Sequence, residues 1–519
     1  MKFIQGKNRT QAALFPVSLD NAIDADNDVR IIDLFVDSLD LLQFGFKIHF
    51  PENGRPAYHP TVLLKIFIYG YMNRIRSSRT LEKECKRNIE LMWLTGSLTP
   101  DHNTIANFRK ENPAAVKKVF GSTVKIARHF DLIGGKLIAG DSTKLRAQNS
   151  KKNNFNQKKI DRHLQYIDNK LEEHSKEMAQ ADGDEQKRQI QKEIDKQNSR
   201  KDDYQNLEKQ LDDSGEKQIS TTDPDSRQIV IRNNITEVAY NVQVTTDAEH
   251  CLPIDYQVTN SNDAKAMGNM VRRAKSILRN NDFTALFDKG YYTGTELKIA
   301  QDLGIHTLVA EPKPASHAPD HRYNVIHFIY DQTGDHYTCP EGNQLTSNGS
   351  IYIKHKDKPN PTYFKQYKTK DCKTCPVHQL CTANKIGKLI ERNTLTPVYE
   401  RNRKNLNQNP ELYKRRQAIV EHPFGTIKRQ WGFDHVLTKK GRHRASADVG
   451  LIFTAYNLRR LINIVGIARL QEFMVAIIRL FFKINSLIMP FKAVFSCLKS
   501  KLLLHRIIYP FYPNLLYLS

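Results

Sequence analysis

The chain has 519 residues, a formal net charge of +23 and a pI near 9.5. Its length predicts two or three domains, and its excess of Lys and Arg predicts a polyanionic partner, because such cations repel one another unless phosphates neutralise them. Nucleic acid is therefore favoured over an anionic membrane. Seven cysteines are too few for a disulfide scaffold, and the first residues contain no long apolar core of a signal peptide, so we expect a reducing, cytoplasmic location.

Apolar residues recur every three or four positions between residues 60 and 130, in PTVLLKIFIYGYMNRI and RTLEKECKRNIELMWL, which predicts helices. The stretch LTPDHNTIANFRKEN offers three candidate N-caps for a further helix: Asp101, Asn103 and Thr104. This helix is expected to carry Arg109 and Lys110 on its polar side, which suits a helix presented to DNA, although an ordinary surface helix has the same basic face. We predict an N-terminal helical DNA-binding domain at residues 1–130.

A long polar segment, residues 150–218, is predicted to form an antiparallel helical hairpin. Its first helix carries apolar residues at heptad spacing: Ile160, Leu164, Ile167, Leu171 and Met178. A second helix is expected after the polar break AQADGDE. Because the hairpin has no site-like cluster, we treat it as an insertion that braces the core or contacts a partner.

Short runs of β-branched and aromatic residues follow in residues 227–259, which predicts two or three antiparallel strands. A helix at residues 264–279 is expected to lead into the apolar strand FTALF, and IHTLVA is expected to form another short strand. A segment rich in Pro, Lys and Tyr, residues 313–397, then interrupts the chain. A long basic helical region is predicted from about residue 400 to residue 464.

Two aspartates each follow an apolar, strand-like run. Asp141 ends the run in KLIAGDSTKLRA, and Asp288 ends the run in FTALFDKGYYTG. In a largely parallel or mixed α/β sheet such strand ends converge on one crevice. Bare carboxylates repel one another there, and a hard divalent cation with oxygen ligands removes that repulsion. Taken singly, an aspartate at the end of a strand is more often a turn former or a helix cap.

A metal site of this kind predicts a third acid, for which Glu421 is the candidate. It is the only acid between Glu411 and Asp434, in a block, residues 401–444, that holds twelve Lys and Arg against three acids. The alternative is that Glu421 forms half of a surface ion pair. Pro423 lies two residues beyond this acid and removes a helix hydrogen bond, so a kink or a helix start is expected there.

Four cysteines fall inside the interruption, in YTCPEG and KDCKTCPVHQLC: Cys339, Cys372, Cys375 and Cys381. A CxxC pair with two further cysteines can close a tetrahedral zinc site, and His378 is a competing ligand. The spacing is irregular because only one CxxC is present. The sequence is compatible with two alternatives, a structural zinc site and free thiols packed in a small subdomain.

The C-terminal segment, residues 465–519, is an apolar and basic tail. Arg479 and Lys483 interrupt its apolar runs, so it holds no clean span of about 20 apolar residues. An amphipathic or partner-packing helix is therefore favoured over a membrane span.

Together these motifs resemble a DDE transposase of a bacterial insertion sequence, from the branch that shares an RNase H-like core and a Tyr-Arg-Glu-Lys block around the third acid. The matching pieces are the helical stretch YHPTVLLKIFIYGYM to WLTG, PDHNTIANFRK, GDSTKLRA, YNVQ, FDKGYY, VEHPFGTIKR and GLIFTAYNLRRL, which span residues 50–464. The spacing from Glu421 to Lys428 agrees with that block. Tyr413 and Arg416 each lie one residue farther from Glu421 than the usual pattern.

This resemblance implies an α/β, RNase H-like mixed-sheet catalytic core at residues 131–464, interrupted by the helical hairpin and the Cys-containing subdomain. It implies two Mg²⁺ or Mn²⁺ ions held by Asp141, Asp288 and Glu421, which would activate water or a 3′-hydroxyl and stabilise the leaving oxygen. Three cations are expected to neutralise backbone phosphates: Lys289, Arg416 and Lys428. Thr143 and Tyr291 are expected to line the crevice.

The function implied is metal-dependent cleavage at the ends of the element and strand transfer to target DNA, in a homodimer acting at the nucleoid. A catalytically inactive DNA-binding protein descended from a transposase is the alternative, and the presence of all three acids argues against it. A recombinase with a covalent Tyr or Ser nucleophile would need an Arg-rich tyrosine block, which the sequence does not show.

Overall fold

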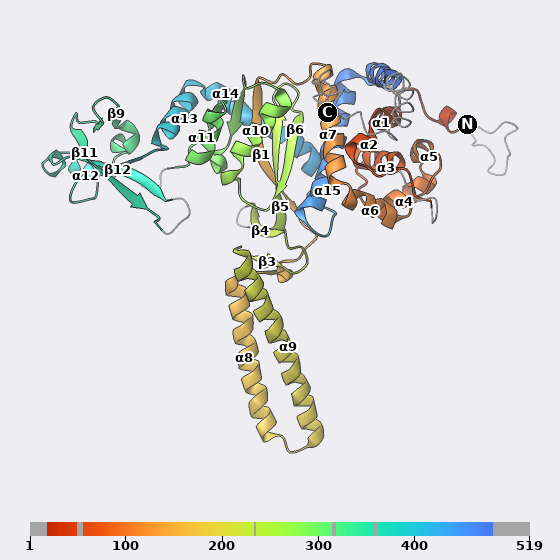
Figure 1. Ribbon diagram of the computed structural model, residues 1–519, viewed down its shortest axis with the longest axis horizontal. Helices are drawn as coiled ribbons and strands as arrows, with labels where there is room; N and C mark the ends of the chain where they lie inside the picture. The colour runs from red at the N-terminus through yellow and green to blue at the C-terminus, as the bar shows by residue number, and fades with distance from the viewer. Residues whose placement is uncertain (1–17, 49–55, 233–234, 314–317, 357–360, 481–519) are drawn as a thin grey trace, which may run out of the picture. The chain divides into compact units, whose positions relative to one another are not determined.

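A computed structural model describes residues 18–48, 56–232, 235–313, 318–356 and 361–480 (Figure 1). The chain divides into two compact units, Met1–Ser122 with Thr454–Ser519, and Thr123–Phe453. Residues 481–519 of the predicted tail lie outside the described residues. Within the described ranges no single helix is long and apolar enough to cross a membrane. One pair of helices with a sharp bend between them, residues 442–465 and 467–480, is long and apolar enough when the two are taken together, by length and composition only.

The first unit is built from helices, as predicted for residues 60–130. They are α1 (Asp28–Asp37), α2 (Leu41–Phe44), α3 (Pro60–Met72), α4 (Ser78–Arg87), α5 (Ile89–Thr95) and α6 (His102–Glu111). Helices α7 (Pro113–His129) and α15 (Arg442–Val465) each belong to both units. Asp101 is the N-cap of α6, because its side chain accepts hydrogen bonds from the backbone N–H groups of Asn103 and Thr104.

A six-stranded mixed sheet forms the centre of the second unit. Its strands are β1 (Leu137–Arg146), β4 (Arg227–Arg232), β5 (Ile235–Asp247), β6 (Pro253–Thr259), β7 (Thr284–Phe287) and β8 (His306–Val309). Their order is β4-β5-β1-β7-β8, and β6 also pairs with β5. The pairs β1–β5, β4–β5 and β5–β6 are antiparallel, whereas β1–β7 and β7–β8 are parallel. The predicted α/β class, the mixed sheet and the antiparallel strands at residues 227–259 are confirmed.

Four helices accompany this sheet: α10 (Met267–Leu278), α11 (Gly294–Asp302), α13 (Thr396–Gln408) and α14 (Pro410–Phe424). Helix α10 lies where a helix was expected at residues 264–279. Helix α14 runs through Pro423 and continues into a π-helical segment, Gly425–Gln430. Proline lacks the N–H that an α-helix needs, and wider π turns are one way in which a helix continues past such a residue. The break expected near Pro423 is therefore a change of helix type.

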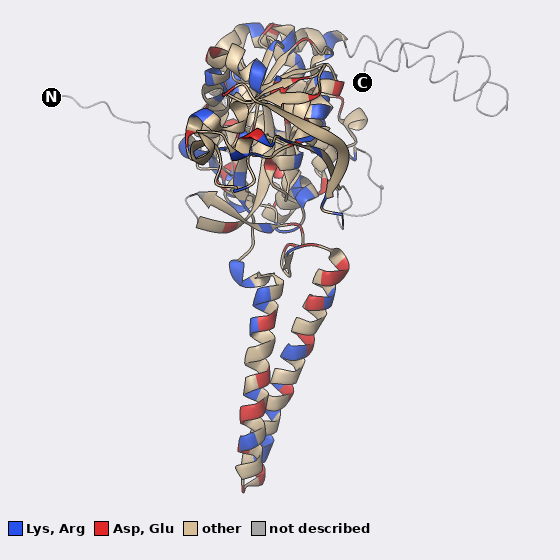
Figure 2. Ribbon diagram, turned by 90° about the vertical axis from the view of Figure 1, so that its left-hand side faces the viewer, with Lys and Arg blue, Asp and Glu red and all other residues tan. Residues whose placement is uncertain are grey.

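The predicted hairpin is formed by α8 (Gln157–Gln180) and α9 (Asp184–Ser214), which run side by side in Figure 1. Strands β2 (Asn154–Phe155) and β3 (Ile219–Ser220) pair at its base, next to a small core of Phe155, Ile160 and Leu211. Figure 2 shows cationic and acidic positions interspersed along both helices. Neither helix therefore presents a face of one sign that would suit a phosphate backbone.

The Cys-containing segment holds a second sheet, with antiparallel order β13-β12-β11-β10-β9. Its elements are β9 (Ile329–Asp331), β10 (His336–Thr338), β11 (Gln344–Lys354), β12 (Thr362–Lys368), β13 (Ile390–Asn393) and the short helix α12 (His378–Cys381). The sequence did not predict these strands. Along β11 only Leu345 is buried, so the alternation of apolar and polar residues that marks a half-buried strand is missing.

Gly140 of β1 lies against the ring of Phe287, and its replacement by alanine should destabilise the second unit. An added Cβ would lie 2.0 Å from Phe287 Cε1, closer than any real contact. We expect Gly140→Ala to lower the free energy of unfolding by about 1–3 kcal/mol through overpacking, measured by urea unfolding. Gly425→Ala is the control, because its Cβ would meet nothing within 4 Å at a helical residue, where alanine is favoured. Equal stability of the two variants would contradict this packing argument.

Candidate active site

The register of β1 against β7 brings Asp141 and Asp288 together. The two strands are parallel, and Ala139 pairs with Leu286. The same offset places Asp141 level with Asp288, two residues farther along. Side chains alternate between the faces of a strand, so both carboxylates lie on the face that bears Ala139 and Leu286.

The prediction that Asp141 ends its strand is wrong, because β1 continues to Arg146. Antiparallel pairing with β5 extends from Ile138 to Arg146, and this long-range partner supports the polar stretch after Asp141. Asp288, in contrast, directly follows β7 as predicted, and its side chain accepts a hydrogen bond from the Gly290 N–H at 2.9 Å. The structure thus confirms the strand end at one of the two acids.

Helix α14 packs on the face of the sheet that carries the two aspartates. Ile419 and Val420 of α14 share a buried cluster with Ala139, Leu286 and Leu308 of the sheet. This packing positions the polar side chains of the same helix over the strand ends. Tyr413 donates a hydrogen bond to the Phe287 carbonyl at 3.1 Å, and Arg416 Nη1 lies 3.0 Å from Asp141 Oδ2.

Asp141 is a half-buried carboxylate that is paired with the cation Arg416. Burial raises the pKa of Asp141, and the negative charge of Asp288 acts in the same direction. The Ser142 N–H, which donates to Asp141 Oδ1 at 2.7 Å, and the Arg416 guanidinium oppose this rise. The balance is a raised pKa of Asp141, for which burial is the main cause and the charge of Asp288 a smaller one.

Glu421 lies near the end of α14, and its carboxylate is exposed. It accepts a hydrogen bond from Gln417 Nε2 at 2.8 Å, one turn earlier in the same helix. No hydrogen bond or ion pair joins it to Asp141 or Asp288, and no group of three or more His, Cys, Asp or Glu among the described residues is arranged to hold a metal ion. Asp141 and Asp288 are hard oxygen ligands of the kind that suits Mg²⁺, and the metal ion itself stays a prediction.

Asp263, in the turn before α10, is a further acid beside this site. Its Oδ1 accepts hydrogen bonds from Asn241 Nδ2 at 2.8 Å and Gln243 Nε2 at 2.7 Å, and its Oδ2 lies 3.4 Å from Lys144 Nζ. Although burial acts in the opposite direction, Lys144 and these amides hold the pKa of Asp263 below its usual value.

The Asp263 network is linked to the loop that carries Asp288. The hydroxyl of buried Tyr291 donates a hydrogen bond to Gln243, and a Cβ on Gly290 would lie 3.0 Å from Asp288 Oδ1 and 3.6 Å from Asp263 Oδ2. Lys144 and Asp141 are three residues apart on β1 and so point to opposite faces of the sheet. The alternation of Asn241 and Gln243 in YNVQ was the available sequence signal for this network.

The cations predicted to contact DNA differ in their surroundings. Lys289 follows Asp288 directly and is exposed, whereas Arg416 is paired with Asp141. Lys428 Nζ donates to the Lys144 carbonyl at 3.2 Å, and Lys110 donates to Asn107 at 2.9 Å and faces Glu111. Only Lys289 therefore extends into solvent next to an acid of the site.

The placement of Arg109 on the polar side of its helix is wrong, because this residue is only 5% exposed. Its guanidinium lies over the Phe67 ring and donates a hydrogen bond to the Tyr71 hydroxyl at 2.9 Å. Both aromatic residues belong to α3, which is buried on nearly every side. Arg109 thus packs inside the first unit, and in this conformation it cannot reach a phosphate.

Four cysteines, Cys339, Cys372, Cys375 and Cys381, line one small pocket in the second sheet's subdomain together with His378. All four are free thiols. Burial raises the pKa of Cys381, and the three neighbouring cysteines act in the same direction, against the charge of Lys388. The four thiols therefore lie near one another, but they are not arranged as a group that could hold a metal ion among the described residues. The structural zinc ion stays a prediction.

The second unit is thus a mixed α/β domain with two half-buried carboxylates and an arginine on one face of its sheet. Two family models match the chain, "Transposase domain (DUF772)" at residues 17–111 and "Transposase DDE domain" at residues 338–462. These matches support a DDE transposase. The second match includes Arg416, Glu421 and Lys428. It begins at residue 338, so it does not include Asp141 or Asp288.

Among curated proteins nothing matches the chain. One solved structure, the piggyBac transposase synaptic complex with hairpin DNA, is similar over 88% of this chain and 86% of that chain, at 9% sequence identity and a TM-score of 0.25. A TM-score this low does not establish a shared fold.

Proposed function

We propose that this chain is the transposase of a bacterial insertion sequence, which cleaves DNA at the ends of its element and transfers the strands to target DNA. The observation that carries the proposal is the placement of Asp141, on β1, level with Asp288, which directly follows the parallel strand β7, under the helix that supplies Arg416 and Glu421. The two transposase family matches support the same reading. The mixed sheet, with β6, β5 and β1 antiparallel and β7 and β8 parallel to β1, supports an RNase H-like core.

Divalent Mg²⁺ or Mn²⁺ would be held by Asp141, Asp288 and Glu421, and it would supply charge stabilisation and an activated water or 3′-hydroxyl. Arg416 fixes the orientation of the Asp141 carboxylate through their ion pair. Asp263 and Gln243, through Tyr291, hold the loop that carries Asp288. Lys289, exposed beside Asp288, is placed to neutralise a DNA phosphate next to the reacting bond.

The partners in this proposal are double-stranded DNA, at the element ends and at the target, and a second copy of the chain. The net charge of +23 supports a polyanionic partner. The proposal implies a cytoplasmic location at the nucleoid, where such DNA lies.

The test is cleavage of a linear DNA that contains the coding region with its natural flanks. We expect nicks at inverted repeats on both sides of the coding region in the presence of Mg²⁺, and none when EDTA removes the metal. Tight binding to these ends without any cleavage under either condition would instead identify a transposase-derived DNA-binding protein.

Binding to DNA should weaken steeply as salt is added. Each phosphate that a Lys or Arg neutralises releases counterions, so several contacts should give a log–log slope of about −4 or steeper for the association constant against salt concentration. Fluorescence anisotropy with a labelled duplex over a series of KCl concentrations measures this slope. A slope near zero would show that the basic surface does not bind the DNA backbone.

A further inference from the structure

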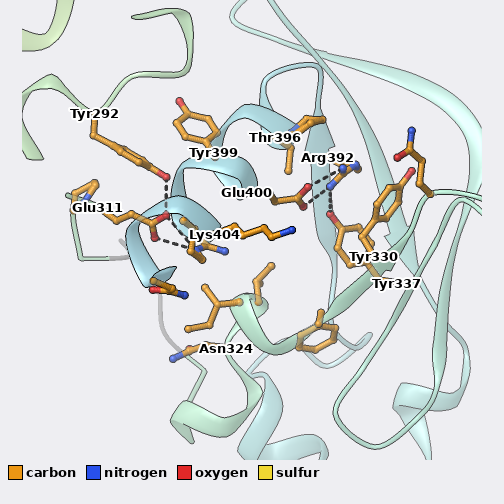
Figure 3. Close-up of a pocket in the computed structure, with 18 of the residues that line it drawn as sticks. Tyr292, Glu311, Asn324, Tyr330, Tyr337, Arg392, Thr396, Tyr399, Glu400 and Lys404 are labelled. Carbon is orange, nitrogen blue, oxygen red and sulfur yellow. Dashed lines mark hydrogen bonds and ion pairs between the residues drawn. The ribbon is translucent and has the colours of Figure 1, made fainter. Parts of the chain in front are cut away.

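A large groove lies between α13 and the second sheet, and its lining includes Tyr292 but neither Asp141 nor Asp288. Its volume is about 1510 Å³, well above the roughly 300–1,000 Å³ of sites that bind a small molecule. We call it the Lys404 groove, and it is lined by residues from the segments 292–337 and 388–408 (Figure 3). A space of this size suits a stretch of a chain-like ligand more than one compact small molecule.

The Lys404 groove is positively charged. Two carboxylates and five cations line it, and the cations are Lys313, Lys388, Arg392, Arg403 and Lys404. Both carboxylates are neutralised within the groove: Arg403 Nε lies 3.1 Å from each oxygen of Glu311, and Arg392 makes a two-pronged pair with Glu400. The remaining positive charge is therefore available to an anion.

Lys404 is the cation best placed to bind that anion. Figure 3 shows its side chain extending between Glu311 and Glu400. It is exposed, and no hydrogen bond or ion pair joins it to another residue of the described ranges. An ammonium group held open in a groove of this kind is a site for a phosphate.

Aromatic rings form both sides of the same groove. Five aromatic residues line it: Tyr292, Phe328, Tyr330, Tyr337 and Tyr399. The rings of Tyr292 and Tyr399 lie 5.0 Å apart, and on the other side the Arg392 guanidinium lies over the Tyr330 ring at 3.6 Å. Aromatic faces stack with any unpaired base, and neighbouring cations bind the phosphates between such bases.

We propose that the Lys404 groove binds an unpaired stretch of a DNA strand, with bases stacked on the half-buried rings of Tyr292 and Tyr399 and a phosphate at Lys404. The proposal rests on the proposed function, because it takes DNA as the partner, and it adds a binding site for a strand that has left the duplex. A fully paired duplex would not fill the groove in this way, since its bases are stacked on one another and offer the tyrosines no free face.

The test compares the affinity of the full chain for two labelled probes by fluorescence anisotropy. One probe is a blunt duplex, and the other is the same duplex with a short unpaired thymidine extension at its 3′ end. We expect the extended probe to bind roughly 10-fold more tightly, as stacking of one or two bases would give. Lys404→Ala and Tyr292→Leu should remove most of this difference, whereas Tyr292→Phe, which keeps the ring, should retain it.

Lys385→Ala is the matched control, because Lys385 is exposed in the same subdomain and does not line the groove. It removes the same charge and should leave the preference for the extended probe unchanged. Equal binding of the two probes by the unaltered chain, or an equal loss for both probes in Lys404→Ala, would overturn the proposal. Cleavage of element ends is scored separately, so failure of the groove and failure of the transposase activity are distinguishable.

Discussion

Asp141→Asn should reduce metal-dependent cleavage by at least about 100-fold, since even groups that only support a metal ligand cost 10–100-fold when removed. The change removes one of two carboxylates that lie level, on β1 and directly after β7, and leaves every candidate phosphate contact in place. DNA affinity should therefore be nearly unchanged. Parallel nicking and gel-shift assays measure the two quantities, and Asp288→Asn should behave in the same way.

The stability of Asp141→Asn separates a functional acid from a structural one. Because the pKa of Asp141 is raised in the folded chain, folded protein holds a proton there more strongly than unfolded protein does. Ionisation of Asp141 at neutral pH therefore costs folding free energy. The neutral asparagine removes that cost but also the ion pair with Arg416, so the midpoint of thermal unfolding should hold or rise at neutral pH.

Asp282→Asn is the control for both measurements, because Asp282 is exposed shortly before β7 and makes the same change of charge and size. It should cleave and unfold like the unaltered chain. Retained nicking by Asp141→Asn would remove this acid from the site, and a clear fall in its stability would assign it a structural role.

The two aspartates differ in how far the sequence could predict them. Asp288 follows the four residues of β7, Thr284–Phe287, of which the last three are apolar, so a local pattern located both the strand and its end. Asp141 lies inside β1, and that strand continues because β5, about a hundred residues later, pairs with its polar half. Local patterns contain no information on such a partner, and the level placement of the two acids follows only from the register between β1 and β7.

The surroundings of Arg109 and the Lys404 groove also depend on contacts between distant segments, which local sequence patterns do not predict. Arg109 occupies a position that looks polar in its own helix, and only the packing of α6 against α3 buries it under Phe67 and Tyr71. The groove joins residues from Tyr292 to Lys404 through a second sheet whose strands have little apolar alternation. A site assembled from several segments in this way leaves no spacing in the sequence to find.

Glu421 is the acid with the least support from its present contacts, so its replacement is the most decisive experiment on the site. Its carboxylate is bound to Gln417, yet it belongs to the helix that covers the face of Asp141 and Asp288. If it completes the metal site, Glu421→Gln keeps the size and hydrogen-bonding capacity of the side chain and removes one ligand charge. Cleavage should then fall by at least about 100-fold, while DNA affinity should hold or rise slightly, because a negative charge leaves a basic block.

Glu411→Gln provides the matched control, because Glu411 is an exposed acid in the first turn of the same helix and is paired with Lys414. It should cleave normally. Normal cleavage by Glu421→Gln as well would remove Glu421 from the metal site and direct the search for a third ligand to Asp263, beside the Asp288 loop. Asp263→Asn would then be assayed over a series of Mg²⁺ concentrations. A ligand would shift the concentration needed for half-maximal cleavage, whereas a residue that only positions Gln243 and Lys144 would lower the rate at every concentration. The contacts of Asp263 with Gln243 of β5 and with Lys144, which points to the face of β1 opposite Asp141, favour the second result.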